Sequence, residues 1–185
     1  MKKIVEISHM ILQDYIGEDK IAIDFTLGHG NDTLYLQGCK EVYSFDIQKE
    51  AIEECQKLNL SDHVHLILDS HENFMNYVEH FDIGIFNFGY FPQGDQSITT
   101  VLEVSRKTVA SALQQLNKKG ILLLVCYIGH EEGKKEGNYF KEMAKKLNGH
   151  YFRTFLFEMQ NTNQAPFIIG IEKIRNETKG EILCH

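Results

Sequence analysis

Short apolar runs alternate along the chain with stretches in which apolar side chains recur at helical spacing. The runs predict buried strands at 20–25, 41–46, 64–69, 81–87 and 121–127. The helical spacing predicts helices over 4–17, 32–36, 49–58, 73–78, 99–116 and 139–147, with Gly120 ending the fifth of them. Two further strands, 151–159 and 166–173, follow each other directly and are joined by the polar loop 161–164.

This order of elements predicts an α/β fold. Strands that alternate with helices form right-handed βαβ units in a parallel sheet. The short loop 161–164 instead favours an antiparallel hairpin for the final pair. A mostly parallel, seven-stranded sheet with a C-terminal antiparallel hairpin and helices on both faces is the Rossmann-like arrangement of class I methyltransferases. We expect one domain over 1–175 and a polar tail over 176–185.

The composition narrows the class of protein. With 185 residues the chain can bury a core without disulfides or a structural metal. The four cysteines form no CxxC pair, and His63, His65 and His71 lie in different local settings, so no metal site is expected. The N-terminus lacks a signal-peptide pattern and no apolar stretch reaches membrane-spanning length, so we expect no membrane segment and a cytoplasmic location.

Charge is distributed unevenly along the chain. The net charge is −7, which argues against a protein that coats nucleic acid through its phosphates. Residues 1–100 carry 6 basic and 17 acidic side chains, whereas residues 101–185 carry 13 basic and 9 acidic ones. A nucleic-acid contact is therefore expected only from the second half, unless the asymmetry is chance clustering on a solvated surface.

The densest chemical signal is a glycine turn after the first predicted strand, with Gly28 and Gly30 in the spacing G-x-G-x-x-T. Glycines there let the backbone approach a ligand at the carboxyl end of a parallel sheet. Asp24 lies four residues before Gly28, where it would favour a cationic ligand over a pyrophosphate. S-adenosylmethionine, with its sulfonium and ammonium groups, is such a ligand; the alternative is an ordinary turn between a strand and a helix.

The next two strand ends also carry polar groups. Asp46 could accept hydrogen bonds from both ribose hydroxyls, with Gln48 beside it, and the cluster Asp69-Ser70-His71 could contact an adenine edge. Each could instead be a helix cap. Three successive strand ends with such groups together favour an adenosyl cofactor.

The fourth strand end suggests chemistry on an amine. Asn87-Phe88-Gly89-Tyr90 resembles the segment that orients the target nitrogen in amino-methylating enzymes, where amide and carbonyl oxygens accept the amine protons. The amine would lose its proton to Asp95, to His130 or to water. The alternative is a glycine- and proline-containing loop with aromatic side chains in the core.

Six motifs together resemble a family of small class I S-adenosylmethionine-dependent methyltransferases long labelled rRNA methylases. They are DFTLGHGNDT (24–33), FDIQ (45–48), DSHE (69–72), NFGYFPQGD (87–95), YIGHEEGKKE (127–136) and NQAPFIIGIEK (163–173). The family turn usually has His29 and Asn31 exchanged, and it has glycine where this chain has Gln93. Members of this family are associated with methylation of the 5-aminomethyl group of wobble uridine in bacterial tRNA.

The motifs and the resemblance together imply a set of site residues. The expected cofactor contacts are Asp24, Thr26, Gly28, His29, Gly30, Asn31, Asp46, Ile47, Gln48, Asp69, Ser70 and His71. The expected catalytic group is Asn87, Phe88, Gly89, Tyr90 and Asp95, and the expected substrate contacts are Phe91, His130, Lys134 and Lys135.

The function expected from the resemblance is N-methylation of the 5-aminomethyl group of 2-thiouridine at position 34, with the tRNA anticodon loop as partner. Two alternatives stay open, which are a methyltransferase acting on rRNA or on a small amine, and a non-catalytic adenine-nucleotide-binding protein. The sequence leaves the oligomeric state open, including a homodimer.

Overall fold

The computed structural model describes residues 3–88, 101–129, 131–162 and 164–176. Its elements in chain order are α1 (Ile4–Leu12), β1 (Ile21–Asp24), α2 (Asn31–Leu36), β2 (Glu41–Asp46), α3 (Lys49–Cys55), β3 (Val64–Leu68), the 3-10 helix η1 (His71–Asn76), β4 (Phe81–Phe88), α4 (Leu102–Gln115), β5 (Leu116–Cys126), α5 (Glu131–Lys146), β6 (Phe152–Phe157) and β7 (Phe167–Lys173). Of the predicted tail 176–185, all but its first residue lies outside these ranges.

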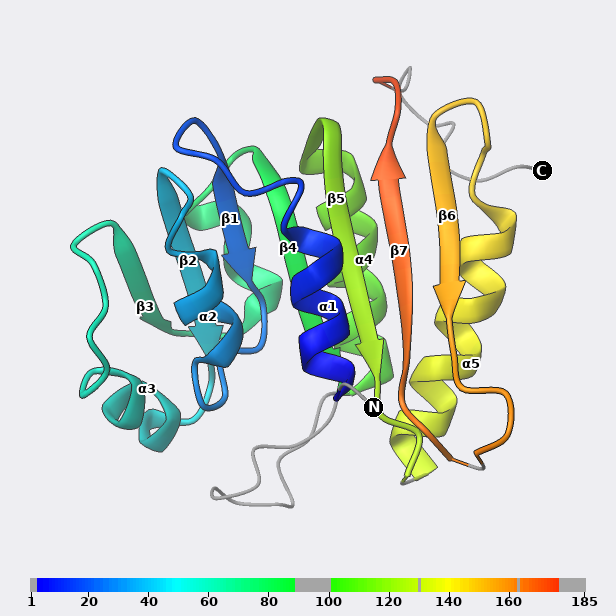
Figure 1. The fold of residues 1–185 in the computed structure, drawn as a ribbon, viewed down its shortest axis with the longest axis horizontal. Helices are drawn as coiled ribbons and strands as arrows, with labels where there is room; N and C mark the ends of the chain where they lie inside the picture. The colour runs from blue at the N-terminus through cyan, green and yellow to red at the C-terminus, as the bar shows by residue number, and fades with distance from the viewer. Residues whose placement is uncertain (1–2, 89–100, 130, 163, 177–185) are drawn as a thin grey trace.

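The strands form one seven-stranded sheet in the order β3-β2-β1-β4-β5-β7-β6 (Figure 1). The first five strands pair in parallel, while β7 pairs antiparallel with both β5 and β6. The predicted fold, including its antiparallel C-terminal hairpin, is therefore confirmed. Because all parallel strands point the same way, the carboxyl ends of β1, β2, β3 and β4 share one edge of the sheet, at the bottom of Figure 1.

Helices cover both faces of this sheet, with α1 and α2 on one side and α4 and α5 on the other (Figure 1). The side chains of β5 alternate accordingly. Leu123 and Val125 pack with Leu12 of α1, whereas Leu122 and Leu124 belong to the aromatic-rich core beneath α4 and α5. Strands buried on both faces are uniformly apolar, which is why the runs could be recognised in the sequence.

The end of α4 differs from the sequence prediction, since Gly120 lies inside β5 and does not end the helix. The helix ends at Gln115, and the buried ammonium of Lys173 donates hydrogen bonds to the carbonyls of Leu113 (3.2 Å) and Gln114 (3.0 Å). A cation at a helix C-terminus satisfies carbonyls that have no partner within the helix. This cap comes from β7, so no local pattern could reveal it.

Other helices also differ from prediction, and α1 ends at Leu12 although the sequence predicts a helix as far as residue 17. The helix α5 begins at Glu131, well before the predicted start at residue 139, and it includes Gly137. This glycine packs against Phe167, since an added Cβ would lie only 2.9 Å from the Phe167 ring. Tertiary packing here outweighs the low helix propensity of glycine. The predicted helix 73–78 is instead the 3-10 helix η1, beginning at His71.

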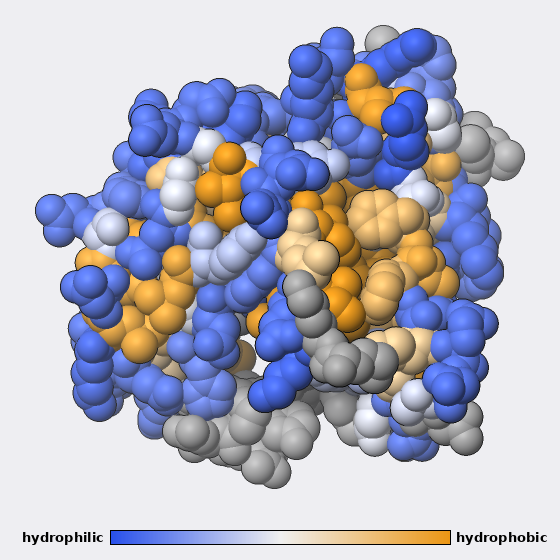
Figure 2. Space-filling model, in the orientation of Figure 1, coloured by the Kyte–Doolittle hydropathy of each residue, from blue (hydrophilic) through white to orange (hydrophobic). Residues whose placement is uncertain are grey.

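Apolar side chains gather beside α1 over β7 and β6 on the face shown in Figure 2. Phe155 and Phe157 of the edge strand β6 are partly exposed there. The ring of Phe155 lies directly over Gly170 of β7, which has no side chain to cover that part of the sheet. Within the described ranges, no helix has the length and apolar character needed to cross a membrane.

Candidate active site

The turn after β1 is built around two glycines. Gly28 and Gly30 have φ values of 49° and 73°, and a Cβ on Gly30 would lie 2.8 Å from Cys55 Sγ and 2.9 Å from Leu58 Cδ1. Only glycine adopts this backbone without strain and also fits this space. The Gly28 amide donates to Asp46 Oδ2 at 3.1 Å, so the turn is joined to the end of β2.

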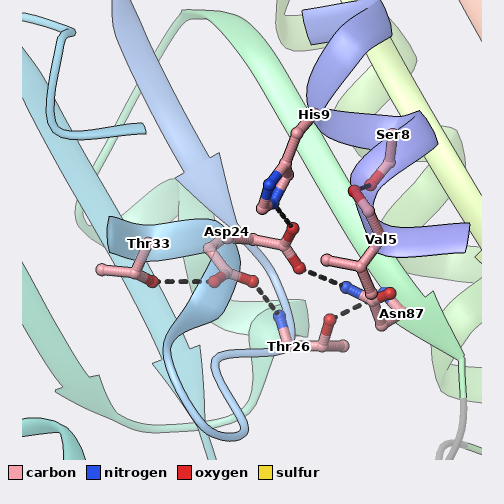
Figure 3. A network of polar contacts seen from close by, with 8 residues as sticks. Val5, Ser8, His9, Asp24, Thr26, Thr33 and Asn87 are labelled. Carbon is pink, nitrogen blue, oxygen red and sulfur yellow. Dashed lines mark hydrogen bonds and ion pairs between the residues drawn. The ribbon is translucent and has the colours of Figure 1, made fainter. Parts of the chain in front are cut away.

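Asp24 lies beneath this turn and is completely buried. Its carboxylate accepts hydrogen bonds from the Thr26 amide (3.1 Å) and the Thr33 hydroxyl (2.7 Å), as Figure 3 shows. The Thr33 hydroxyl also lies 2.8 Å from that of Ser44. Burial, together with the nearby negative charge of Asp32, raises the pKa of Asp24 to about 7. These contacts give Asp24 a structural role in the turn; the predicted direct contact with the cofactor stays a prediction.

The side-chain amide of Asn87 is held in a hydrogen-bond network at the end of β4. Its Nδ2 donates to Asp32 Oδ2 at 2.6 Å, and its backbone amide donates to Thr26 Oγ1 at 2.7 Å. His9 of α1 donates from Nε2 to the other oxygen, Asp32 Oδ1, at 2.7 Å (Figure 3). The His9 ring stacks on Tyr35 with a centroid separation of 4.0 Å. This network joins the N-terminal helix, the turn and the fourth strand.

His9 and Asp32 are residues that sequence reasoning missed. Asp32 has a signal in the sequence, because it belongs to the motif at 24–33, although the helical spacing predicts only that a helix begins there. His9 has no such signal, because it lies in an amphipathic helix far from every motif in the sequence.

Asp46 is mostly buried and accepts backbone hydrogen bonds from Gly28 (3.1 Å) and Gln48 (2.9 Å). Burial raises the pKa of Asp46 above its usual value, and the amide donors offset this only in part. The next residue, Ile47, is 56% exposed, and Gln48 is buried at the start of α3. A carboxylate and an exposed apolar side chain therefore lie side by side at this edge.

The three polar residues after β3, which are Asp69, Ser70 and His71, make different contacts. Asp69 accepts hydrogen bonds from Ser70 N (2.7 Å), Asn73 Nδ2 (2.8 Å) and Tyr77 Oη (2.9 Å), and these donors, Asn73 first, lower its pKa. Ser70 accepts from the Glu72 amide at the start of η1. Ser70 therefore caps η1, and Asp69 lies beside this cap; their predicted contact with an adenine edge stays a prediction.

His71 is different, because its buried Nε2 has no hydrogen-bond partner within the described part of the chain. The imidazole packs edge-on against Phe86 at a centroid distance of 5.6 Å. Burial lowers the pKa of His71 to about 4, so the ring is neutral near pH 7. An unpaired buried nitrogen is costly without a ligand or a water molecule.

The other predicted site residues are distributed as follows. His29 Nδ1 donates to Glu54 Oε1 at 2.9 Å, and Asn31 is exposed at the first position of α2. Phe88 is completely buried and stacks on Phe140 at 4.7 Å, which makes it a core residue and leaves it no surface for a substrate. Outside the described residues are Gly89, Tyr90, Phe91, Gln93, Asp95 and His130.

Lys134 and Lys135 are exposed in the first turns of α5, near the carboxyl end of β5. Lys135 pairs with Glu132 at 2.6 Å. By contrast, Lys118 and Lys119 lie near the start of β5, at the opposite edge of the sheet. Only some of the basic residues of the second half therefore lie near the candidate site.

The described residues offer little for metal or cysteine chemistry. They contain no group of three or more His, Cys, Asp or Glu side chains that could hold a metal ion. Cys39, Cys55 and Cys126 are buried and free, and burial raises the pKa of Cys55 to about 12. A thiol with so high a pKa is a poor nucleophile at neutral pH.

The family model described as "Putative rRNA methylase" matches residues 42–172. A tRNA (mnm5s2U34)-methyltransferase, chloroplastic, of Arabidopsis thaliana is 30% identical over 95% of this chain and 71% of its own length. A putative rRNA methylase from Clostridium thermocellum is 32% identical over 94% of this chain and 99% of its own, with a TM-score of 0.87.

A putative methyltransferase from Streptococcus mutans, solved in complex with SAH, is 34% identical over 94% of this chain and 99% of its own, with a TM-score of 0.84. SAH is the product that S-adenosylmethionine leaves after methyl transfer. The similarity therefore indicates the cofactor as well as the fold. The chain therefore belongs to the rRNA methylase family and is an S-adenosylmethionine-dependent methyltransferase.

Proposed function

We propose that this enzyme methylates the 5-aminomethyl nitrogen of 2-thiouridine at the wobble position of tRNA. The observation that carries the proposal is the orientation of the Asn87 amide. Its NH₂ group donates a hydrogen bond to Asp32. The amide oxygen, Oδ1, can therefore accept a hydrogen bond from the substrate amine that receives the methyl group. The Arabidopsis relative, named for this nucleoside, supports the same choice of substrate.

The cofactor side of the site fits S-adenosylmethionine. The Asp46 carboxylate retains acceptor capacity for ribose hydroxyls, and the exposed Ile47 offers an apolar surface for an adenine ring. The unpaired Nε2 of His71 would gain a partner from a bound adenosyl group. When bound, the cofactor supplies an electrophilic methyl group on a sulfonium.

The protein contributes mainly orientation to the reaction. Asn87 Oδ1 accepts an N–H from the amine, which turns the nitrogen lone pair toward the methyl carbon. The amine nitrogen would form its bond to the methyl carbon as the carbon–sulfur bond breaks, S-adenosylhomocysteine would leave, and the proton lost by the amine would pass to water. No covalent enzyme intermediate is required, in keeping with the raised pKa of Cys55.

The tRNA would approach the carboxyl edge of the sheet. Lys134 and Lys135 lie at that edge, and Arg106 and Lys107 project from the first half of α4. An anticodon loop needs only a few phosphate contacts when the target base enters a pocket. The net charge of −7 is therefore compatible with a local contact.

The test is nucleoside mass spectrometry of tRNA that carries the 5-aminomethyl group, incubated with enzyme and S-adenosylmethionine. We expect the 5-methylaminomethyl nucleoside with wild-type enzyme and little with Asn87→Ala. Parallel reactions contain rRNA or small alkylamines in place of tRNA. Methylation of either of these but not of tRNA would contradict the proposed substrate, and full activity of Asn87→Ala would contradict the orientation role.

A further inference from the structure

The orientation of Asn87 depends on two residues that would not themselves touch the acceptor amine. We propose that Asp32 and His9 are positioning residues, which together keep the amide oxygen of Asn87 directed at the acceptor. This inference rests on the proposed function, in which that oxygen orients the amine. It makes the N-terminal helix α1 part of the catalytic machinery.

Asp32 determines which end of the Asn87 amide faces the acceptor. The terminal torsion of an asparagine side chain is broad and roughly two-fold, so the amide alone could present either its oxygen or its NH₂ group. A carboxylate only accepts hydrogen bonds, and Asp32 Oδ2 lies 2.6 Å from Asn87 Nδ2. Rotating the amide by half a turn would place two oxygens against each other, so the carboxylate selects one orientation.

His9 in turn holds the Asp32 carboxylate. The Asp32 side chain is only 9% exposed, so its second oxygen needs a protein donor, which His9 Nε2 provides at 2.7 Å. The stacking of His9 on Tyr35, with ring planes only 4° apart, limits rotation of the imidazole. Asn87 of β4 is thus held by a residue of α2, Asp32 of α2 by a residue of α1, and His9 of α1 by a residue of α2.

The contacts of His9 and Asp32 are separate from those of Asp46 and His71, the two polar side chains that the proposed function gives to the cofactor. Asp46 and His71 make no hydrogen bond with His9 or Asp32 among the contacts of the described residues. Loss of the His9 contact should therefore lower kcat and leave the affinity for S-adenosylmethionine unchanged. A purely structural role in the fold would not produce this division.

The main variant is His9→Phe, which keeps a ring that can stack on Tyr35 but removes the donor. We expect kcat on tRNA to fall by roughly tenfold, because a small displacement of an orienting group costs about one to two orders of magnitude. His9→Gln restores an amide donor and should recover part of the rate. Asp32→Asn, which lets the Asn87 amide rotate, should cost roughly 100-fold.

The chain contains a matched control in His65. Its Nε2 donates to Glu41 Oε2 at 2.7 Å, and its ring stacks on Tyr43 at 4.7 Å, which repeats the chemistry of His9 on the β2–β3 pair. His65→Phe should retain wild-type kcat. If His9→Phe also retains it in an enzyme that methylates tRNA, or if His65→Phe loses as much, the inference is wrong.

A second measurement does not depend on the substrate. The side-chain amide protons of Asn87, assigned by their absence in Asn87→Ala, should exchange slowly with water in ¹⁵N-labelled wild-type protein and faster in His9→Phe and Asp32→Asn. If wild-type enzyme does not methylate tRNA, the proposed function fails while this comparison still decides the inference. Unchanged exchange in both variants would overturn it.

Discussion

The carboxylate of Asp46 accepts a hydrogen bond from the backbone amide of Gly28 at 3.1 Å, and this bond joins the end of β2 to the turn after β1. Its second oxygen accepts the amide of Gln48 at 2.9 Å. Two neighbouring strand ends therefore share one carboxylate, so a change at Asp46 alters the shape of the cofactor site as well as its charge.

Asp46→Asn should weaken binding of S-adenosylmethionine. The amide loses the charge-assisted hydrogen bonds to ribose, each worth about 1.5–3 kcal/mol, so Kd should rise by roughly 10- to 100-fold in isothermal titration calorimetry. Asp19→Asn is the control, because Asp19 is exposed before the start of β1, at the opposite edge of the sheet, where it pairs with Lys20 at 3.0 Å. Equal losses of affinity in the two variants would show that Asp46 has no special role.

The stability of the Asp24→Asn variant relative to wild type should increase as the pH rises. The pKa of Asp24 is raised to about 7, so the folded state keeps a proton that the unfolded state loses near pH 4. The contribution of Asp24 to the free energy of unfolding of the wild type is therefore fully present below pH 4 and is lost as the pH rises through 7. An asparagine can accept from Thr26 and donate to Thr33, whose hydroxyl can then donate to Ser44.

The measurement is urea unfolding of both proteins between pH 4 and pH 8. The difference in unfolding free energy should increase with pH by up to about 4 kcal/mol in favour of the variant. A difference that does not change with pH would contradict the raised pKa. The same variant tests the cofactor contact predicted from sequence, because retained affinity for S-adenosylmethionine would limit Asp24 to its structural role.

Gly30→Ala should destabilise the protein and disturb the turn. The residue has a φ of 73°, and the added Cβ would meet Cys55 Sγ at 2.8 Å, so strain and overpacking together should cost about 2–4 kcal/mol in thermal or urea unfolding. Gly149→Ala provides the comparison, since no atom lies within 4 Å of a Cβ added there and its φ is not positive. Similar stabilities for the two variants would mean that the turn can relax.

Lys134→Ala should weaken tRNA binding more than Lys135→Ala does. Lys135 is paired with Glu132 at 2.6 Å, so part of its charge is already neutralised. Removal of one phosphate contact should lower affinity several-fold and reduce the slope of log K against log salt by about 0.7–0.9. Filter binding over a range of salt concentrations measures both, and Lys118→Ala, at the opposite edge of the sheet, should leave both unchanged.

The strands and the glycine turn could be predicted from the sequence because their causes are local. A strand buried on both faces must be apolar along its length, as in Leu122 to Val125, and a turn with positive φ requires glycine at Gly28 and Gly30. Asp46 at the end of β2 and Asn87 near the end of β4 could be recognised in the same way.

Only the tertiary structure decided which of these residues act together. His9, Asp32 and Asn87 are separated by 23 and 55 positions along the chain, and they meet because the sheet places β4 beside β1 and packs α1 against α2. The cap of α4 by Lys173 arises in the same way, over 60 positions. Hydrophobic periodicity reports which face of an element is buried, but the partner of a buried polar group depends on how distant segments pack.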